Sequence, residues 1–187
     1  YGGAKAGGKS SCLIMDALIE CFQNPANSTR CFLFRRNYPD LESSLIHEFK
    51  QHADLKIVKL YNETKHEVIM PNGNGIYFRY AENLNQLKDS YNGISMQYVG
   101  IDQAEKWSQE EVEFLSIQLR TTNPKVKPKL RLTANPGGQG DGFLNRDFVK
   151  AAKPETPFTI ETNLAMIFHD LDIPEQLKEL RDQGLIK

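Results

Sequence analysis

The chain contains 187 residues, of which 40% are hydrophobic and 25% are charged, and its net charge is −1. These values are typical of a globular domain with a substantial core and give no sign of a strongly basic nucleic-acid binder, although DNA contact needs only a local basic patch. No apolar run approaches the roughly 20 residues that span a bilayer, and the three cysteines lack the spacing of a zinc site or a disulfide framework.

In chain order, apolar residues at helical and strand spacing predict alternating helices and strands after a glycine-rich loop at residues 2–8. The predicted elements are a helix at 10–21, strands at 30–34, 55–60, 67–70, 76–80, 95–102, 129–133 and 158–162, and further helices at 40–52, 108–119, 143–152 and 174–183. Ser108 is a candidate N-cap that forms a capping box with Glu111. This alternation favours an α/β fold with a mostly parallel central sheet flanked by helices, and residues 71–75 predict a hairpin inserted in it or at one edge.

The clearest motif is the segment GAKAGGKS at residues 3–10, which fits the pattern GxxxxGK[ST] of a phosphate-binding loop, the Walker A motif. Glycines let the backbone wrap so that its N–H groups face phosphate oxygens, and the following helix adds the positive end of its dipole. Lys9 is expected to reach the β- and γ-phosphates of a nucleotide, and Ser10 to bind Mg²⁺. The predicted nucleotide-binding residues are Gly3, Ala4, Lys5, Ala6, Gly7, Gly8, Lys9, Ser10 and Ser11. The alternative is a chance glycine-rich turn, which the helical pattern directly after the loop disfavours.

A second motif is the strand QYVGID, which ends in Asp102 and is a Walker B candidate whose carboxylate would hold Mg²⁺ together with Ser10. Enzymes of this class usually place a glutamate directly after that aspartate, where it polarises the attacking water. Here the residue is Gln103, and an amide cannot act as a base. Three explanations stay open: Gln103 replaces a natural glutamate, Glu105 is the base instead, or the domain binds nucleotide and hydrolyses it poorly.

A third motif, LTANP, places Thr133, Ala134 and Asn135 at the end of the strand after Walker B, where polar side chains suit a γ-phosphate sensor. An Asn-Pro turn is the alternative, and only the order of motifs along the chain favours the sensor. Arg35 and Arg36 follow the strand at 30–34, and a solvated strand end is the favoured interpretation of both over contact with nucleotide or DNA.

The order of the segments GGAKAGGKS, VGIDQAE, IQLRTTNP and RLTANPGGQGDGF resembles the large terminase subunit of tailed bacteriophages over residues 1 to about 150. The NPGG segment, followed by an aromatic and a basic segment, is the most specific part of this resemblance. The resemblance implies a P-loop NTPase of the ASCE class that uses ATP and Mg²⁺. Its activity would be that of a motor which hydrolyses ATP to drive double-stranded DNA through a portal into a procapsid.

The resemblance also suggests roles for single residues. Lys5 lies where the family often has an arginine that acts on the nucleotide of its own subunit, and lysine keeps the charge but loses the bidentate fork. Arg120 resembles an arginine before a Thr-Asn-Pro stretch, and it would serve an adjacent subunit as a finger or pair with a nearby carboxylate. Thr133 and Asn135 match the coupling motif of the family, whereas Gln103 departs from its catalytic glutamate.

The resemblance implies that residues 1–187 are the motor domain without the nuclease domain of the family. Tyr1 directly precedes the loop without the strand that should feed it, so we expect truncation at the N-terminus and a C-terminal subdomain or linker at roughly 151–187. The expected partners are double-stranded DNA, a portal protein, a small terminase subunit and further copies in a ring, in the host-cell cytoplasm and without a membrane. The alternatives are another P-loop DNA translocase or helicase, or a nucleotide-binding assembly module with weak hydrolysis.

Overall fold

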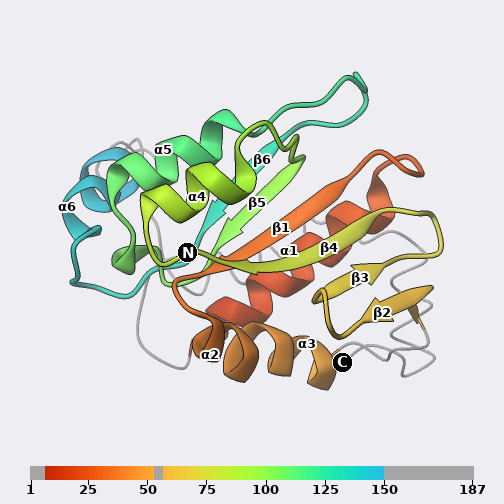
Figure 1. Ribbon diagram of the computed structural model, residues 1–187, viewed down its shortest axis with the longest axis horizontal. Coiled ribbons are helices and arrows are strands. Elements are labelled where there is room, and N and C mark those ends of the chain that lie inside the picture. The colour runs from red at the N-terminus through yellow and green to blue at the C-terminus, as the bar shows by residue number, and fades with distance from the viewer. Residues whose placement is uncertain (1–6, 53–56, 150–187) are drawn as a thin grey trace.

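A six-stranded sheet lies at the centre of the structure, a computed structural model that describes residues 7–52 and 57–149 (Figure 1). Its order is β2-β3-β4-β1-β5-β6, in which β4, β1, β5 and β6 are parallel and β2 and β3 add an antiparallel edge. The strands are β1 (Arg30–Arg35), β2 (Leu60–Asn62), β3 (Glu67–Ile69), β4 (Gly75–Tyr80), β5 (Tyr98–Ile101) and β6 (Lys129–Leu132). The mostly parallel sheet agrees with the prediction, and the hairpin that contains residues 71–75 joins β3 to β4 at one side.

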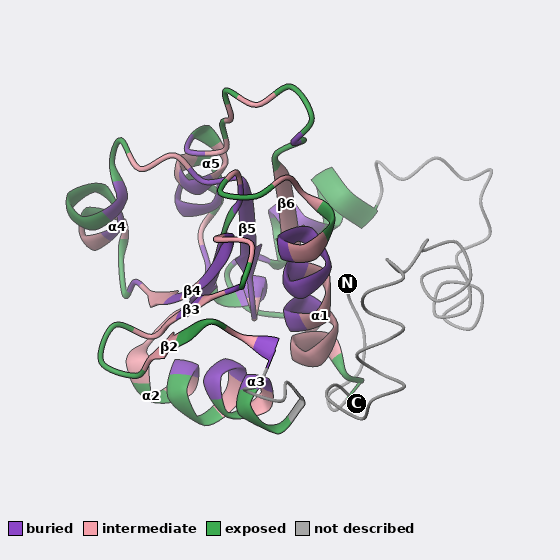
Figure 2. Cartoon of the chain, turned by 90° about the vertical axis from the view of Figure 1, so that its right-hand side faces the viewer, coloured by how far each residue is buried: buried purple, intermediate pink, exposed green. Residues whose placement is uncertain are grey.

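Helices cover both faces of this sheet. The α-helices are α1 (Lys9–Gln23), α2 (Tyr38–Leu41), α3 (His47–His52), α4 (Leu84–Tyr91), α5 (Gln109–Ile117) and α6 (Asp141–Leu144). A π-helical segment, Glu42–Ile46, joins α2 to α3, a second one, Asn145–Val149, follows α6, and a 3₁₀ turn spans Ala104–Lys106. Figures 1 and 2 show α1 and α3 on one face of the sheet and α4 and α5 on the other.

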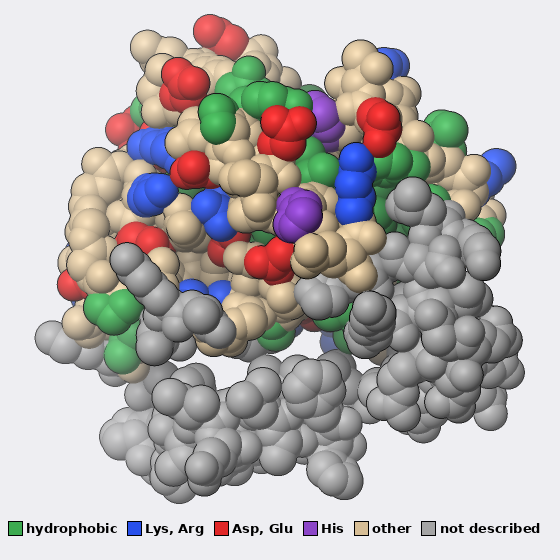
Figure 3. Space-filling view, turned by 90° about the horizontal axis from the view of Figure 1, so that it is seen from below, with side chains coloured by type: hydrophobic (Ala, Val, Ile, Leu, Met, Phe, Trp, Pro, Cys, Tyr) green, Lys and Arg blue, Asp and Glu red, His purple; other side chains and the backbone are tan. Residues whose placement is uncertain are grey.

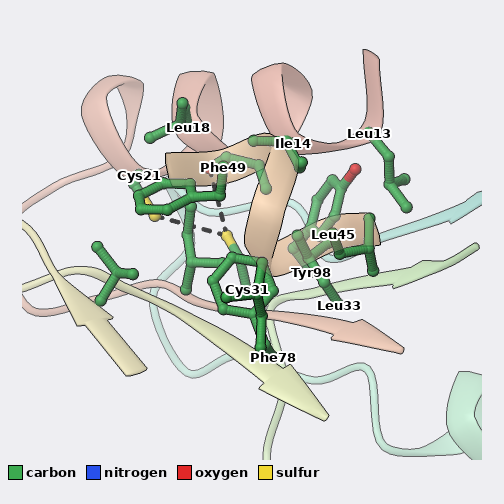
Figure 4. Packing of buried hydrophobic residues seen from close by; sticks show 14 of the residues in the cluster. Leu13, Ile14, Leu18, Cys21, Cys31, Leu33, Leu45, Phe49, Phe78 and Tyr98 are labelled. Carbon is green, nitrogen blue, oxygen red and sulfur yellow. Dashed lines mark hydrogen bonds between the residues drawn. The ribbon is translucent and has the colours of Figure 1, made fainter. Parts of the chain in front are cut away.

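Successive side chains of β1 point to opposite faces, and each face builds its own hydrophobic core. Cys31 and Leu33 pack with the apolar stripe of α1 and with the segment that ends in α3 (Figure 4). Phe32 and Phe34 pack with α4, α5 and Trp107 on the other face. Figure 2 shows the buried residues concentrated where the helices meet the strands. Each fully buried side chain of this kind contributes about 1.5–3 kcal/mol to folding, so the sheet is a rigid base for the loops at its edges.

The thiols of Cys21 and Cys31 lie 3.7 Å apart in the α1 core, and both are free. Burial raises the pKa of Cys31 well above its usual value, and the neighbouring Cys21 raises it further. The reactive form of cysteine is the thiolate, so Cys31 is a packing residue with an inert thiol.

Two local predictions differ from the structure. The strand predicted at 55–60 is wrong over residues 57–59, because β2 begins only at Leu60, while residues 53–56 lie outside the described part. Helix α4 was not predicted, because its sequence buries only Leu87 and Tyr91, too few apolar positions to show a helical period. The side chain of Asn83 accepts a hydrogen bond from Gln86 N at 3.0 Å and caps this helix.

Other predictions concern the ends of elements. The Ser108 capping box of α5 is present as predicted. The predicted helix at 143–152 begins earlier, at Asp141, and becomes π-helical at 145–149. The strand at 158–162 and the helix at 174–183 lie outside the described residues.

The described part of the face in Figure 3 mixes acidic and basic side chains, as expected from the net charge of −1. None of the described helices is both long and apolar enough to cross a membrane.

Candidate nucleotide-binding site

The carboxyl ends of β1, β5 and β6 and the first turn of α1 surround a pocket of about 410 Å³. Ligands of open parallel α/β sheets bind at this edge. Arg35 ends β1, Asp102 follows β5 and Thr133 follows β6. Among the described residues, those that line the pocket are Gly7, Gly8, Lys9, Ser10, Arg35, Glu48, Asp102, Gln103, Thr133, Ala134 and Asn135.

The described end of the glycine-rich loop leads directly into α1. Gly8 precedes the helix with φ 67° and ψ 17°, a left-handed conformation that suits glycine best. The first N–H groups of a helix have no partner within it, and here the first turn carries Lys9 and Ser10 on the pocket wall. Such N–H groups, the helix dipole and a lysine together favour phosphate. Gly3, Ala4, Lys5 and Ala6 lie outside the described residues.

Asp102 is the hub of the site, and only 2% of its surface is exposed. Its Oδ2 accepts hydrogen bonds from Ser10 Oγ at 2.8 Å and from Arg35 Nε at 2.8 Å. Its Oδ1 accepts from the backbone N of Gln103 at 3.2 Å and from the hydroxyl of Thr133. The carboxylate therefore ties the first turn of α1 to the ends of three neighbouring strands.

Arg35 is the residue that the sequence interpretation missed. A solvated strand end was the favoured prediction, and it is wrong, because only 6% of Arg35 is exposed and its Nη2 lies 2.7 Å from Asp102 Oδ2. A sequence signal was present in the arginine directly after the apolar strand RCFLF. The sequence did not indicate its partner, Asp102, which is 67 residues away along the chain.

Arg36 has a different environment, on the α5 side of the sheet. Its guanidinium donates to both carboxylate oxygens of Glu111, at 2.8 and 3.0 Å, and lies 5.0 Å from the ring centroid of Trp107. Burial would raise the pKa of Glu111, but hydrogen bonds from Arg36 and Ser108 more than offset it and hold that pKa below its usual value. Arg36 therefore serves the structure of the α5 face and does not line the pocket.

Gln103 directly follows Asp102 and turns the chain with φ 56° and ψ 52°. This left-handed conformation is uncommon for residues other than glycine, asparagine and aspartate, and such strain gathers at functional sites. Among the described residues, the buried Gln103 Oε1 and Asn135 Oδ1 have no hydrogen-bond partner. Both residues line the pocket. Buried acceptors are normally paired, so these two oxygens are suited to accept hydrogen bonds from a ligand or a water molecule in the pocket.

Glu105 does not line the pocket but lies behind Asn135. Its Oε2 accepts a hydrogen bond from the backbone N of Asn135 at 3.0 Å, and its Oε1 accepts from Asn135 Nδ2 at 2.9 Å. Each carboxylate oxygen thus accepts one hydrogen bond from Asn135, and only 8% of the residue is exposed. This geometry suits a residue that positions Asn135 better than one that takes a proton from water.

The remaining predicted residues lie away from the pocket. Ser11 donates to Glu48 Oε2 at 2.7 Å, which fastens α1 to a residue of the pocket wall. Arg120 is exposed at the amino ends of the parallel strands, away from the pocket. Its backbone N donates to Met96 O at 3.0 Å, just before β5 begins. Its guanidinium donates to the carbonyl of Gly93. Within this chain Arg120 does not approach the pocket.

The donors at the pocket fit a magnesium ion bound together with a nucleotide. Magnesium prefers oxygen ligands and usually keeps several waters, with one or two protein oxygens and the substrate phosphates. The Ser10 hydroxyl and the Asp102 carboxylate supply such oxygens, 2.8 Å from each other. No group of three or more His, Cys, Asp or Glu side chains that could cage a metal occurs in the described part of the chain.

Comparison with known proteins gives the family. The family described as "Phage terminase large subunit" matches residues 1–178. A search of curated proteins found no match. The large terminase of a thermophilic bacteriophage is similar in structure, with a TM-score of 0.64 and 16% identity over 100% of this chain and 44% of that one. For the same terminase in complex with ATP-gamma-S, the TM-score is 0.61 and the identity 15%, over 100% of this chain and 43% of that one. For the HK97 bacteriophage large terminase, the TM-score is 0.55 and the identity 11%, over 98% of this chain and 41% of that one.

At these identities the structural likeness shows the fold alone, and the fold is that of the P-loop NTPase domain predicted from the sequence. The chain spans less than half the length of these terminases. The family match, in contrast, extends over nearly all of the chain. The chain therefore belongs to the phage terminase large subunit family.

Proposed function

We propose that this chain is the ATP-hydrolysing motor domain of a terminase large subunit, which drives double-stranded DNA into a procapsid. One observation carries the proposal, the convergence of Lys9, Ser10, Asp102 and the Thr133–Asn135 segment on a single pocket. The family supports a role in DNA packaging. The complex of the thermophilic phage terminase with ATP-gamma-S supports a nucleotide as the ligand.

In this proposal the residues of the pocket have three separate roles. Gly7 and Gly8 and the first turn of α1 hold the phosphates, and Lys9 neutralises their charge. Ser10 and Asp102 hold Mg²⁺, which when bound offsets the negative charge that develops on the phosphates. Asn135 and Gln103 place the attacking water through their unpartnered amide oxygens.

Gln103 raises a second candidate function, a nucleotide-binding assembly module with little turnover. The side chain lies at the pocket, where a glutamate would polarise water, but its amide cannot accept a proton. Glu105, the other candidate base, does not line the pocket and is hydrogen-bonded to Asn135 through both of its oxygens. This arrangement favours slow hydrolysis by the chain as it stands.

The steady-state ATPase activity of the chain, of Gln103→Glu and of Lys9→Ala tests the proposal. A carboxylate at position 103 would supply a general base, so we expect Gln103→Glu to raise turnover by about 10²- to 10⁴-fold with little change in nucleotide affinity. Lys9→Ala should lose nucleotide affinity. Nucleotide binding without turnover in both the chain and Gln103→Glu would favour the assembly module. If the chain as it stands binds no ATP, the proposal is wrong.

The partners are proposals of the same kind. In a ring of copies, Arg120 would have to act on the nucleotide of a neighbouring subunit, because it lies at the amino ends of the parallel strands and the pocket lies at their carboxyl ends. Lys5 would act on the nucleotide of its own subunit. We further propose double-stranded DNA, a portal protein and a small terminase subunit as partners, in the host-cell cytoplasm. Analytical ultracentrifugation with portal protein and DNA would test this assembly.

A further inference from the structure

The hydrogen bonds that Asp102 accepts already use all of its lone-pair sites. A carboxylate offers about four lone-pair sites. Asp102 accepts four hydrogen bonds, from Ser10 Oγ, Arg35 Nε, Gln103 N and Thr133 Oγ1. In addition, Nη2 of Arg35 lies 2.7 Å from Oδ2. A metal ion, or a water in its shell, needs one of these positions. One of the present partners must therefore leave Asp102 when Mg²⁺ arrives.

The geometry identifies Arg35 as the partner that leaves. Gln103 N and Thr133 occupy Oδ1 and belong to the connected backbone after β5 and β6. Ser10 and Arg35 share Oδ2, and Ser10 is the predicted magnesium ligand. A divalent cation beside Ser10 would face the positive guanidinium across a single oxygen, and like charges at this range repel strongly in a buried site.

The pocket also offers Arg35 an alternative anionic partner in the proposed nucleotide. Arg35 lines the same pocket as Lys9, where the proposed nucleotide would bring several negative charges. A guanidinium is always charged and matches phosphate oxygens with two parallel donors. The departing side chain would thus exchange a carboxylate for a phosphate and keep its charge paired.

We propose that Arg35 neutralises Asp102 while the site is empty and exchanges its place on Oδ2 for Mg²⁺ when nucleotide binds, turning its guanidinium to the incoming phosphates. This inference rests on the proposed nucleotide-binding function. Arg35 is then a positioning residue that prevents a buried, uncompensated carboxylate in the empty site. It also couples metal binding to a movement at the end of the central strand β1.

Thermal melting and calorimetric titration of the chain, of Arg35→Gln and of Arg36→Gln test this exchange, with ATP-gamma-S as the probe in EDTA or in excess Mg²⁺. Arg36 is the matched control, because it is the next residue, pairs with the buried Glu111 and does not line the pocket. We expect both variants to melt several degrees lower than the chain without ligand. In EDTA, Arg35→Gln should bind ATP-gamma-S more weakly than Arg36→Gln, since a cation is missing beside the phosphates.

The distinguishing result is the effect of Mg²⁺. In Arg35→Gln the metal alone can compensate Asp102, so Mg²⁺ should tighten nucleotide binding on the order of tenfold more than it does in the chain or in Arg36→Gln. Equal effects of Mg²⁺ in all three proteins would overturn the inference and leave the proposed function intact. Absence of ATP-gamma-S binding by the chain itself would overturn both. If Arg35→Gln does not fold, Arg35→Lys takes its place. Because lysine keeps the charge, the exchange predicts an effect of Mg²⁺ equal to that in the chain, and an effect on the order of tenfold larger would overturn it.

Discussion

The role of Glu105 can be decided by replacing it with glutamine. In the structure its carboxylate accepts from Asn135 N at 3.0 Å and from Asn135 Nδ2 at 2.9 Å. Glutamine has the same shape but only one acceptor oxygen, so its NH₂ group must face one of these two donors. Glu105→Gln therefore loses one hydrogen bond to a charged acceptor and leaves a buried donor unpaired, while the packing is kept.

The loss can be estimated from these two contacts. A hydrogen bond to a charged group contributes roughly 1.5–3 kcal/mol, so Glu105→Gln should lower the free energy of unfolding by ~2 kcal/mol. For a protein of this size, that corresponds to a fall in Tm of about 5 °C. A misplaced Asn135 should also slow ATP hydrolysis, because an error of about 1 Å at a positioning residue costs on the order of 100-fold in rate.

A double-mutant cycle with Asn135→Ala, in the Gln103→Glu background, separates positioning from base catalysis. If Glu105 acts through Asn135, then Glu105→Gln should slow turnover strongly when Asn135 is present and only slightly when it is alanine. Steady-state ATPase rates and thermal melting of the four proteins provide the measurements. A general base would show an undiminished rate loss in the Asn135→Ala background and little loss of stability, and this outcome would refute the positioning role.

Two further predictions concern stability. Gly137 and Gly138 both have φ 89°, but a Cβ on Gly138 would lie 2.5 Å from the carbonyl oxygen of Glu105, whereas one on Gly137 meets nothing within 4 Å. Gly138→Ala should therefore lower the free energy of unfolding by about 1–3 kcal/mol more than Gly137→Ala in urea titrations, and equal losses would show that only backbone strain matters. The pKa of Glu111 is depressed in the folded state, so its stabilising contribution is present above the unfolded pKa of about 4.3 and is lost as pH falls through the lower folded pKa. Acid unfolding curves should consequently be steeper for the chain than for Glu111→Gln, and identical slopes would contradict this account.

The predictions from sequence succeeded where the cause is local. The start of α1 after Gly8, the capping box of Ser108 and the hairpin between β3 and β4 each depend on residues within a few positions of one another. A strand before Asp102 was also found, because the buried parallel strand β5 is a continuous apolar run, although it spans residues 98–101 and not the predicted 95–102. Order along the chain then placed Asp102 and Thr133 together, since neighbouring parallel strands end at the same edge.

What the sequence could not supply are the pairings between distant residues. Arg35 and Arg36 are adjacent and chemically identical, yet one pairs with Asp102 at the pocket and the other with Glu111 on the α5 face. Strand alternation predicts that they diverge, but not which carboxylate each one meets. Glu105 carried the same ambiguity, because its position two residues after Gln103 gave no sign that Asn135 holds both of its oxygens.

These pairings make the turn after β5 and the segment after β6 one connected unit. Ala104 N donates to Thr133 O at 2.7 Å and Gly140 N to Glu105 O at 3.0 Å, while Asn135 is held by the Glu105 carboxylate. Because these hydrogen bonds join Asn135 to Glu105, we predict that a displacement of Asn135 also displaces Glu105, which lies two residues before Trp107. Trp107 packs against Arg36, and Arg36 is joined through the backbone to Arg35 at the pocket. Two chains of contacts thus lead from the pocket to Trp107, one through Asn135 and Glu105 and one through Arg35 and Arg36. Coupling energies between Arg35→Gln and Asn135→Ala, compared in the presence and absence of nucleotide, would measure whether the two routes act together.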